Sequence, residues 1–168
     1  QPEFTQIDIE TAFLDRDDFL PIIEGMVAEV FRRVKGIELP LPFPRLTYEE
    51  ALARFGSDKP DLRFGMELRD LSDLFRGSDV QAFAQVIAGG GEVKALRVPG
   101  AGGMSRKELD DLVAEAQGLG AKGLAWVKVT AEGLQSPLAR VLEPVRTAFL
   151  ERCGVAAGDL ILLIADVP

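Results

Sequence analysis

The segment from Phe43 to Gly65 constrains the fold most, because it separates two parts of the chain with different sequence patterns. Phe43 is held in extended backbone by the proline after it. Thr47 and Glu50 have the spacing of a capping box at the start of a short helix, and Gly56 is suited to end that helix. A polar turn with a proline inside it follows. We therefore predict a folded hinge here and not a slack linker.

The part before the hinge begins with an alternating pattern. Gln6, Asp8 and Glu10 share one side of an extended backbone, and threonine and isoleucine residues occupy the other side. This period of two predicts a strand over residues 3–13. This row of acceptors is either the ordinary polar surface of a solvent-facing strand or the polar floor of a binding site on a sheet. Such a floor would bind a cationic group, since ionised carboxylates only accept hydrogen bonds.

A long amphipathic helix is predicted next, from about Phe19 to Lys35. The residues from Asp15 to Asp18 are expected to supply a turn and the N-cap of this helix. Asp17 and Asp18 lie at its start and basic residues fill its last turn, as the helix dipole favours, and Gly36 is suited to end it. Apolar side chains recur along it with helical spacing, and we expect this stripe to pack as core against the sheet of the predicted strand. The stripe consists of Leu20, Ile23, Met26, Val27, Val30, Phe31 and Val34.

The part after the hinge has the pattern of a compact α+β domain. Val80–Ala88 and Glu92–Val98 predict a β-hairpin around the glycines between them. We predict a mainly antiparallel sheet with helices on one face, and a division of the chain into residues 1–68 and residues 69–168. The other predicted elements are a helix that Ser105 caps at 106–119, strands at 124–130 and 160–165, and a helix at 144–153.

The charge balance limits what the surface can bind. With 27 acidic and 19 basic residues, the net charge of −8 argues against a general nucleic-acid-binding surface. It leaves room for a local RNA contact made by a few cations, although scattered basic residues are usually only solvated. The candidate cations for a tRNA contact are Arg97, Arg106, Lys107, Lys122 and Lys128.

Few residue types suited to catalysis occur in this chain. It has no histidine and one cysteine, Cys153, so neither a nucleophile–base pair nor a Cys/His metal site is predicted. The single cysteine fits a reducing compartment. The glycine clusters match no phosphate-loop motif, and no apolar run approaches the roughly 20 residues of a membrane span. The residues alone indicate no self-sufficient catalytic apparatus.

Three blocks of sequence nevertheless resemble one family. They are QPEFTQIDIE at the start, the hinge itself, and GGMSRKELDDLVAEAQGLGAKGLAWVKV in the second part. In this order they resemble bacterial-type aspartyl-tRNA synthetases of class II, across essentially the whole chain. The resemblance implies an internal fragment that begins at the end of motif 2 of the antiparallel catalytic core. From about Val80 onward it implies the insertion domain often called the GAD domain.

The resemblance also implies an activity and roles for individual residues. The complete enzyme is expected to be a cytoplasmic homodimer that activates L-aspartate with ATP and Mg²⁺. It would transfer the aspartate to the aspartate tRNA, or to both the aspartate and asparagine tRNAs. Gln1 is expected to contact ATP, Gln6 and Asp8 to bind aspartate, and Glu10 to support them without touching the substrate. Motifs 1 and 3 and the motif 2 arginine lie outside the 168 residues, so this chain alone is expected to be inactive and to bind ATP and Mg²⁺ weakly.

A different class of function is an alternative. A domain similar to the second part occurs in the B subunit of the tRNA-dependent amidotransferase, where it would serve as a tRNA-contacting or structural module. The residues up to Gly65 resemble the synthetase and not the amidotransferase. We therefore favour the synthetase.

Overall fold

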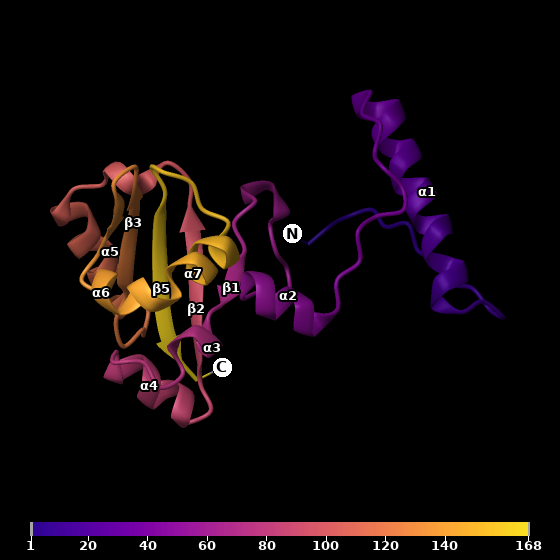
Figure 1. Ribbon diagram of the computed structural model, residues 1–168. Coiled ribbons are helices and arrows are strands. Elements are labelled where there is room, and N and C mark those ends of the chain that lie inside the picture. The colour runs from indigo at the N-terminus through magenta and orange to yellow at the C-terminus, as the bar shows by residue number, and fades with distance from the viewer. Residues whose placement is uncertain (1, 168) are drawn as a thin grey trace. The chain divides into compact units, whose positions relative to one another are not determined.

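The computed structural model describes residues 2–167 (Figure 1). By compactness the chain divides into a first unit up to Leu46 and a second unit from Thr47 onward. This division places the hinge from Thr47 onward with the second unit and its first four residues with the first unit. The domain boundary that we predict after Leu68 rests on sequence pattern and resemblance, and it stays a prediction.

The first unit contains one long helix, α1 (Arg16–Lys35). The Asp15 carboxylate caps it by accepting hydrogen bonds from the backbone N–H groups of Asp17 and Asp18. Gly36 ends the helix in the left-handed conformation, with φ of 67°. The predicted helix and both of its caps are therefore confirmed. No helix among the described residues, α1 included, has the length and apolar character needed to cross a membrane.

Two expectations about the first unit are wrong. Residues 2–15 form no strand, and no strand occurs among the described residues up to Leu46. A strand needs a neighbour with which to exchange backbone hydrogen bonds, and this unit offers none. The apolar stripe of α1 is not core for the same reason, because the unit has no sheet to cover it. Of the stripe residues, Val30, Phe31 and Val34 are 48%, 40% and 70% exposed, and Glu24 is the one buried residue of the helix.

The hinge residues from Thr47 onward form the start of the second unit. Its helix α2 (Tyr48–Phe55) has the predicted capping box of Thr47 and Glu50, and Gly56 ends it with φ of 68°. A 3-10 turn, η1 (Leu62–Phe64), follows. The Arg54 guanidinium then donates two hydrogen bonds, of 2.8 and 3.0 Å, to the Glu67 carboxylate just before the first strand. The prediction of a folded hinge is therefore confirmed.

A five-stranded antiparallel sheet is the centre of the second unit, with strand order β1-β2-β5-β3-β4. Figure 1 shows the last strand of the chain, β5, between β2 and β3. The predicted mainly antiparallel sheet is confirmed. The strands are β1 (Leu68–Asp70), β2 (Glu92–Val98), β3 (Ala125–Thr130), β4 (Gly133–Gln135) and β5 (Leu160–Asp166).

Helices cover the sheet unequally. One face carries the hydrophobic core, in which Phe75, Phe83 and Phe149 pack on Val93 and Ile161 of the strands. The helical elements that supply this layer are α3 (Ser72–Phe75), α4 (Gln81–Ala88), α6 (Ala139–Leu142), η3 (Glu143–Val145) and α7 (Arg146–Cys153).

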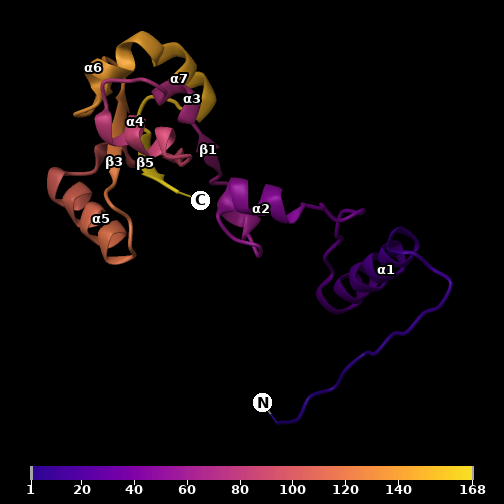
Figure 2. The same ribbon diagram turned by 90° about the horizontal axis from the view of Figure 1, so that it is seen from below.

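The helix α5 (Arg106–Gly118) is the exception to the predicted placement of helices on one face. It follows the 3-10 turn η2 (Ala101–Gly103), and Figure 2 shows it across the sheet from α6 and α7. The Arg106 guanidinium lies 5.7 Å from the ring of Trp126. Trp126 points away from the core, because its neighbour in the strand, Val127, is fully buried on the core face. The capping box of Ser105 and Glu108 forms as predicted.

The predicted strand over Val80–Ala88 is wrong, because these residues form α4. Phe83, Val86 and Ile87 have the spacing of a helical apolar face, and this outweighs the glycine turn that predicts a hairpin. The predicted hairpin is also excluded by the sheet, since both edges of β2 are already paired, to β1 and to β5. Gly91 makes the tight turn after α4. A Cβ there would lie 2.5 Å from Val86 Cγ1 and 2.7 Å from the Asp166 carbonyl oxygen.

Candidate functional site

The predicted acceptor row lies on the irregular segment before α1. Gln6, Asp8 and Glu10 are all exposed there, and no hydrogen bond within the described residues engages their side chains. Gln1, the predicted ATP contact, lies outside the described residues. The first unit therefore leaves this row accessible to a ligand, and its role in substrate binding stays a prediction.

Arg45 anchors the end of the first unit to α1. Its guanidinium lies 3.1 Å from the Asp17 carboxylate and 3.6 Å from that of Glu24. Glu24 is the most buried side chain of this helix, so the arginine supplies a counter-charge where water is partly excluded. Neither Arg45 nor Glu24 carries a predicted role.

Among the predicted RNA contacts, Arg97 is committed to a structural contact. Its Nε donates to the Asp159 carboxylate at 2.7 Å, and a second guanidinium nitrogen donates to the Gly154 carbonyl. Asp159 also accepts from the backbone N–H groups of Gly100 at 3.0 Å and Ala156 at 2.8 Å. Burial acts to raise the pKa of Asp159, but these hydrogen bonds and the Arg97 charge outweigh it, and the pKa lies below its ordinary value. The Asp159 cluster, formed by these residues, joins the end of β2 and the turn after it to the loop between α7 and β5.

The other four cations do not all lie at one place, because Lys122 is apart from the three near the start of α5. Arg106, which stacks on Trp126, pairs with Asp110 at 3.0 Å, and the Lys128 ammonium donates to the Met104 carbonyl nearby. Lys107 follows Arg106 on α5 and is exposed. Lys122 pairs instead with Asp166 at 2.6 Å. Most of these cations are thus engaged inside the domain, and an RNA contact through any of them stays a prediction.

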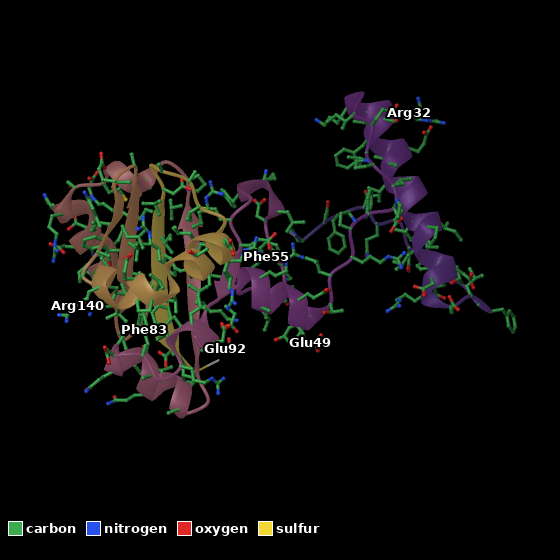
Figure 3. The ribbon with its side chains drawn as sticks, viewed as in Figure 1. Arg32, Glu49, Phe55, Phe83, Glu92 and Arg140 are labelled. Atoms are coloured by element: carbon green, nitrogen blue, oxygen red, sulfur yellow. The ribbon has the colours of Figure 1, made fainter. Side chains whose placement is uncertain are left out.

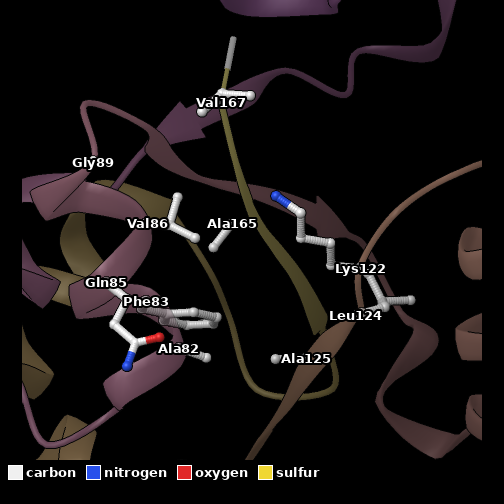
Figure 4. A pocket seen from close by; sticks show the side chains of 11 residues that line it. Ala82, Phe83, Gln85, Val86, Gly89, Lys122, Leu124, Ala125, Ala165 and Val167 are labelled. Carbon is white, nitrogen blue, oxygen red and sulfur yellow. The ribbon is translucent and has the colours of Figure 1, made fainter.

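A cavity of about 660 Å³ lies in the second unit beside α4 (Figure 4). Its wall is mainly apolar, with Gln85 and Lys122 as the polar side chains, which suits the binding of an apolar group. Sequence reasoning misses this cavity, because it assigns the residues of α4 to a strand. The cavity is lined by Ala82, Phe83, Gln85, Val86, Gly89, Lys122, Gly123, Leu124, Ala125, Ala165 and Val167.

Neither a metal cluster nor a reactive thiol is found in the described part of the chain. No three Asp, Glu or Cys side chains of residues 2–167 are grouped so that they could hold a metal ion. Mg²⁺ that binds with ATP usually takes one or two carboxylates from the protein and its other ligands from phosphates and water, so this result assigns no residue of the chain to the Mg²⁺ ion that the family resemblance implies. Cys153 is 5% exposed, and burial raises the pKa of its thiol to about 11, although Arg152 and Arg69 oppose the shift.

We expect Cys153 to be unreactive in the folded chain. A rise in pKa from 9.0 to about 11 lowers the thiolate fraction at pH 8 by a factor of about 100. Alkylation by iodoacetamide at pH 8 should therefore be at least about 100-fold slower in buffer than in urea that unfolds the chain. Mass spectrometry of quenched samples gives both rates. Equal rates in the two solutions would contradict this assignment.

Comparison with known proteins agrees with the architecture of the second unit. Residues 83–168 match the family model of the GAD domain, which covers half of the chain. The chain therefore belongs to the GAD domain family. The matched residues begin within α4 and include β2, β3, β4 and β5.

Individual relatives extend the similarity to the first unit. The chain is 52% identical over 169 residues to the aspartate–tRNA(Asp/Asn) ligase of Geotalea uraniireducens, with all of this chain aligned. It is 50% identical to the ligase of that name from Moorella thermoacetica, with 99% of this chain aligned, and 49% identical to that from Heliobacterium modesticaldum, with all of it aligned. In each case the chain spans 28% of the length of the relative.

Proposed function

We propose that this chain forms part of an aspartate–tRNA ligase, which activates L-aspartate with ATP and attaches it to tRNA. The observation that carries the proposal is identity of 46–52% over 99–100% of the chain to proteins with this name. A match to the GAD domain alone would not distinguish the ligase from other kinds of protein that contain this domain. The aligned first unit, which precedes the matched residues 83–168, favours the ligase.

Within this proposal, Gln6 and Asp8 bind the aspartate substrate. A carboxylate in a closed cleft pairs strongly with an α-ammonium group, and the pairing orients the substrate carboxylate for attack on the α-phosphate of ATP. Gln1 would contact ATP, and Glu10 would hold the other two residues in place. The exposure of this row in the first unit supports the proposal, because the side chains have no competing partner among the described residues.

The proposal extends to the partners of the complete ligase. The names of the relatives include both the aspartate and the asparagine tRNA, so we propose that the ligase charges both. Location in the cytoplasm and assembly as a homodimer follow from the resemblance to the synthetase family. Charging each tRNA transcript separately tests whether the ligase accepts both tRNAs. The mass of the complete ligase in solution tests whether it is a homodimer.

The test uses a hybrid ligase, in which this chain replaces the matching segment of the Geotalea uraniireducens protein. We expect the hybrid ligase to catalyse aspartate-dependent exchange of pyrophosphate into ATP and to charge the aspartate tRNA. The 168-residue chain alone should give neither activity. The parent ligase serves as the positive control.

A folding check makes this test decisive. The circular dichroism spectrum and the thermal unfolding curve of the hybrid ligase should match those of the parent. A folded hybrid without aspartate-dependent exchange would overturn the proposal. So would exchange that another amino acid supports as well as aspartate.

A further inference from the structure

Two arginines of the chain stand apart from the others. Within the described residues, every arginine except Arg76 and Arg140 forms an ion pair with a carboxylate. Both of these side chains belong to the second unit and are exposed. Because the chain has a net charge of −8, carboxylates are abundant, and two unpaired guanidinium groups are therefore notable.

The two arginines line the same cavity, which has a volume of about 570 Å³. Arg76 comes from the loop between α3 and α4, and Arg140 from α6. Figure 3 shows the side chain of Arg140 at the outer edge of the second unit. Asp79 is the one acidic residue of the lining, so the cavity carries an excess of positive charge. We call it the arginine cavity.

The lining of the arginine cavity also contains a buried hydroxyl group without a hydrogen-bond partner in residues 2–167. Ser78 lines the arginine cavity, and its Oγ is the one buried side-chain nitrogen or oxygen of the described residues without a hydrogen-bond partner. A buried hydroxyl left unpaired destabilises the folded state, so native proteins rarely keep one without a reason. Rotation about the Cα–Cβ bond between staggered positions can turn this hydroxyl toward a ligand in the cavity.

We propose that the arginine cavity binds a phosphate group. Two guanidinium groups supply donors that match phosphate oxygens in charge and geometry, and the Ser78 hydroxyl supplies one more donor. The cavity differs in this respect from the one beside α4, whose single cation is already paired with Asp166. The donors of the arginine cavity have no acceptor within the described chain, and a phosphate would provide it.

The phosphate can come from an RNA backbone or from a small phosphorylated molecule. The RNA source rests on the proposed function, since a ligase of this kind handles tRNA. The proposal that the arginine cavity binds a phosphate group does not rest on the proposed function, because all of its donors belong to the second unit. Binding of inorganic phosphate thus tests the site even if the ligase activity is absent.

The test is a titration of the 168-residue chain with sodium phosphate, with sodium chloride added to keep the ionic strength constant. Arginine Nε–H signals in ¹H–¹⁵N NMR spectra report binding, and we expect two of them to shift. Arg76→Ala and Arg140→Ala should each remove one of these signals and weaken phosphate binding about tenfold or more. Arg63→Ala is the matched control, because Arg63 is an exposed arginine of the same unit that pairs only with nearby Asp61.

Ser78→Ala separates binding from stability. It removes the unpaired hydroxyl, so the melting temperature without phosphate should stay the same or rise, while phosphate binding weakens. Repeating the titration with the aspartate tRNA transcript distinguishes the sources. Loss of transcript binding in the Arg76 and Arg140 variants assigns the phosphate to RNA, and an effect on inorganic phosphate alone assigns it to a small molecule. Equal binding by the control and both arginine variants in both titrations overturns the proposal.

Discussion

Replacement of Asp8 by alanine in the hybrid ligase is expected to lower kcat/KM for aspartate about 100-fold or more. In the proposed role its carboxylate pairs with the substrate ammonium inside a closed site. Loss of one partner of such a pair typically costs about 2–5 kcal/mol. The exchange of labelled pyrophosphate into ATP at varied aspartate concentration measures this effect. The KM for ATP should change little, since Asp8 is not expected to contact the nucleotide.

A matched control for this variant is available in the same segment. Glu3 is another exposed carboxylate, at an odd position of the alternating pattern and therefore outside the row of Gln6, Asp8 and Glu10. Glu3→Ala should keep the activity of the hybrid ligase within about twofold, since surface substitutions away from a site have small effects. A similar loss in both variants, or none in Asp8→Ala, would remove Asp8 from the proposed site.

Replacement of Asp159 by alanine should lower the free energy of unfolding of the second unit by about 2–4 kcal/mol. The substitution leaves the N–H groups of Gly100 and Ala156 without their acceptor, and each unsatisfied donor costs about 1–3 kcal/mol. The loss of the Arg97 ion pair adds less, because the guanidinium is partly exposed and can be hydrated. Urea denaturation followed by the fluorescence of Trp126, the single tryptophan, reports on this unit alone.

Asp61→Ala provides the contrast, since Asp61 only caps the short turn η1 and pairs with the exposed Arg63 of that turn. Its effect should be clearly smaller than that of Asp159→Ala. The pH dependence gives a second readout. The pKa of Asp159 in the folded chain lies below its ordinary value of 3.8, so its contribution is present above about pH 4 and is lost as the pH falls through the folded pKa. The difference between wild type and Asp159→Ala should therefore shrink in acid, and a difference that grows would contradict this.

The sequence predicts best the features that local chemistry determines. The capping boxes at Thr47 and Ser105 and the left-handed glycines Gly36 and Gly56 appear where they are expected. These contacts involve residues only a few positions apart, so no knowledge of the tertiary fold is needed. The central strand β5 is predicted from its own sequence, since a short apolar run that follows the turn at Gly158 and Asp159 is typical of a buried strand.

Features that depend on distant partners are predicted poorly. The alternation at residues 3–13 suits a strand, yet a strand requires a neighbour that the described chain does not supply. The pattern around Phe83 fits both periods, and the pairing of β2 with β1 and β5 decides for the helix α4. The arginine cavity depends on which arginines lack an ion pair, and the sequence alone gives no sign of that. The predicted roles of Gln6 and Asp8 come from resemblance and not from geometry.

The position of β5 also bears on how this domain is made in the cell. β2 and β3 are not paired with each other, and the last strand of the chain lies between them. A ribosome releases Leu160–Asp166 only after everything else in the sheet has emerged, so until then each of these two strands has an open edge. Open strand edges invite pairing with other chains. The emergence of β5, more than that of any earlier strand, is therefore the moment at which the nascent domain is protected from aggregation.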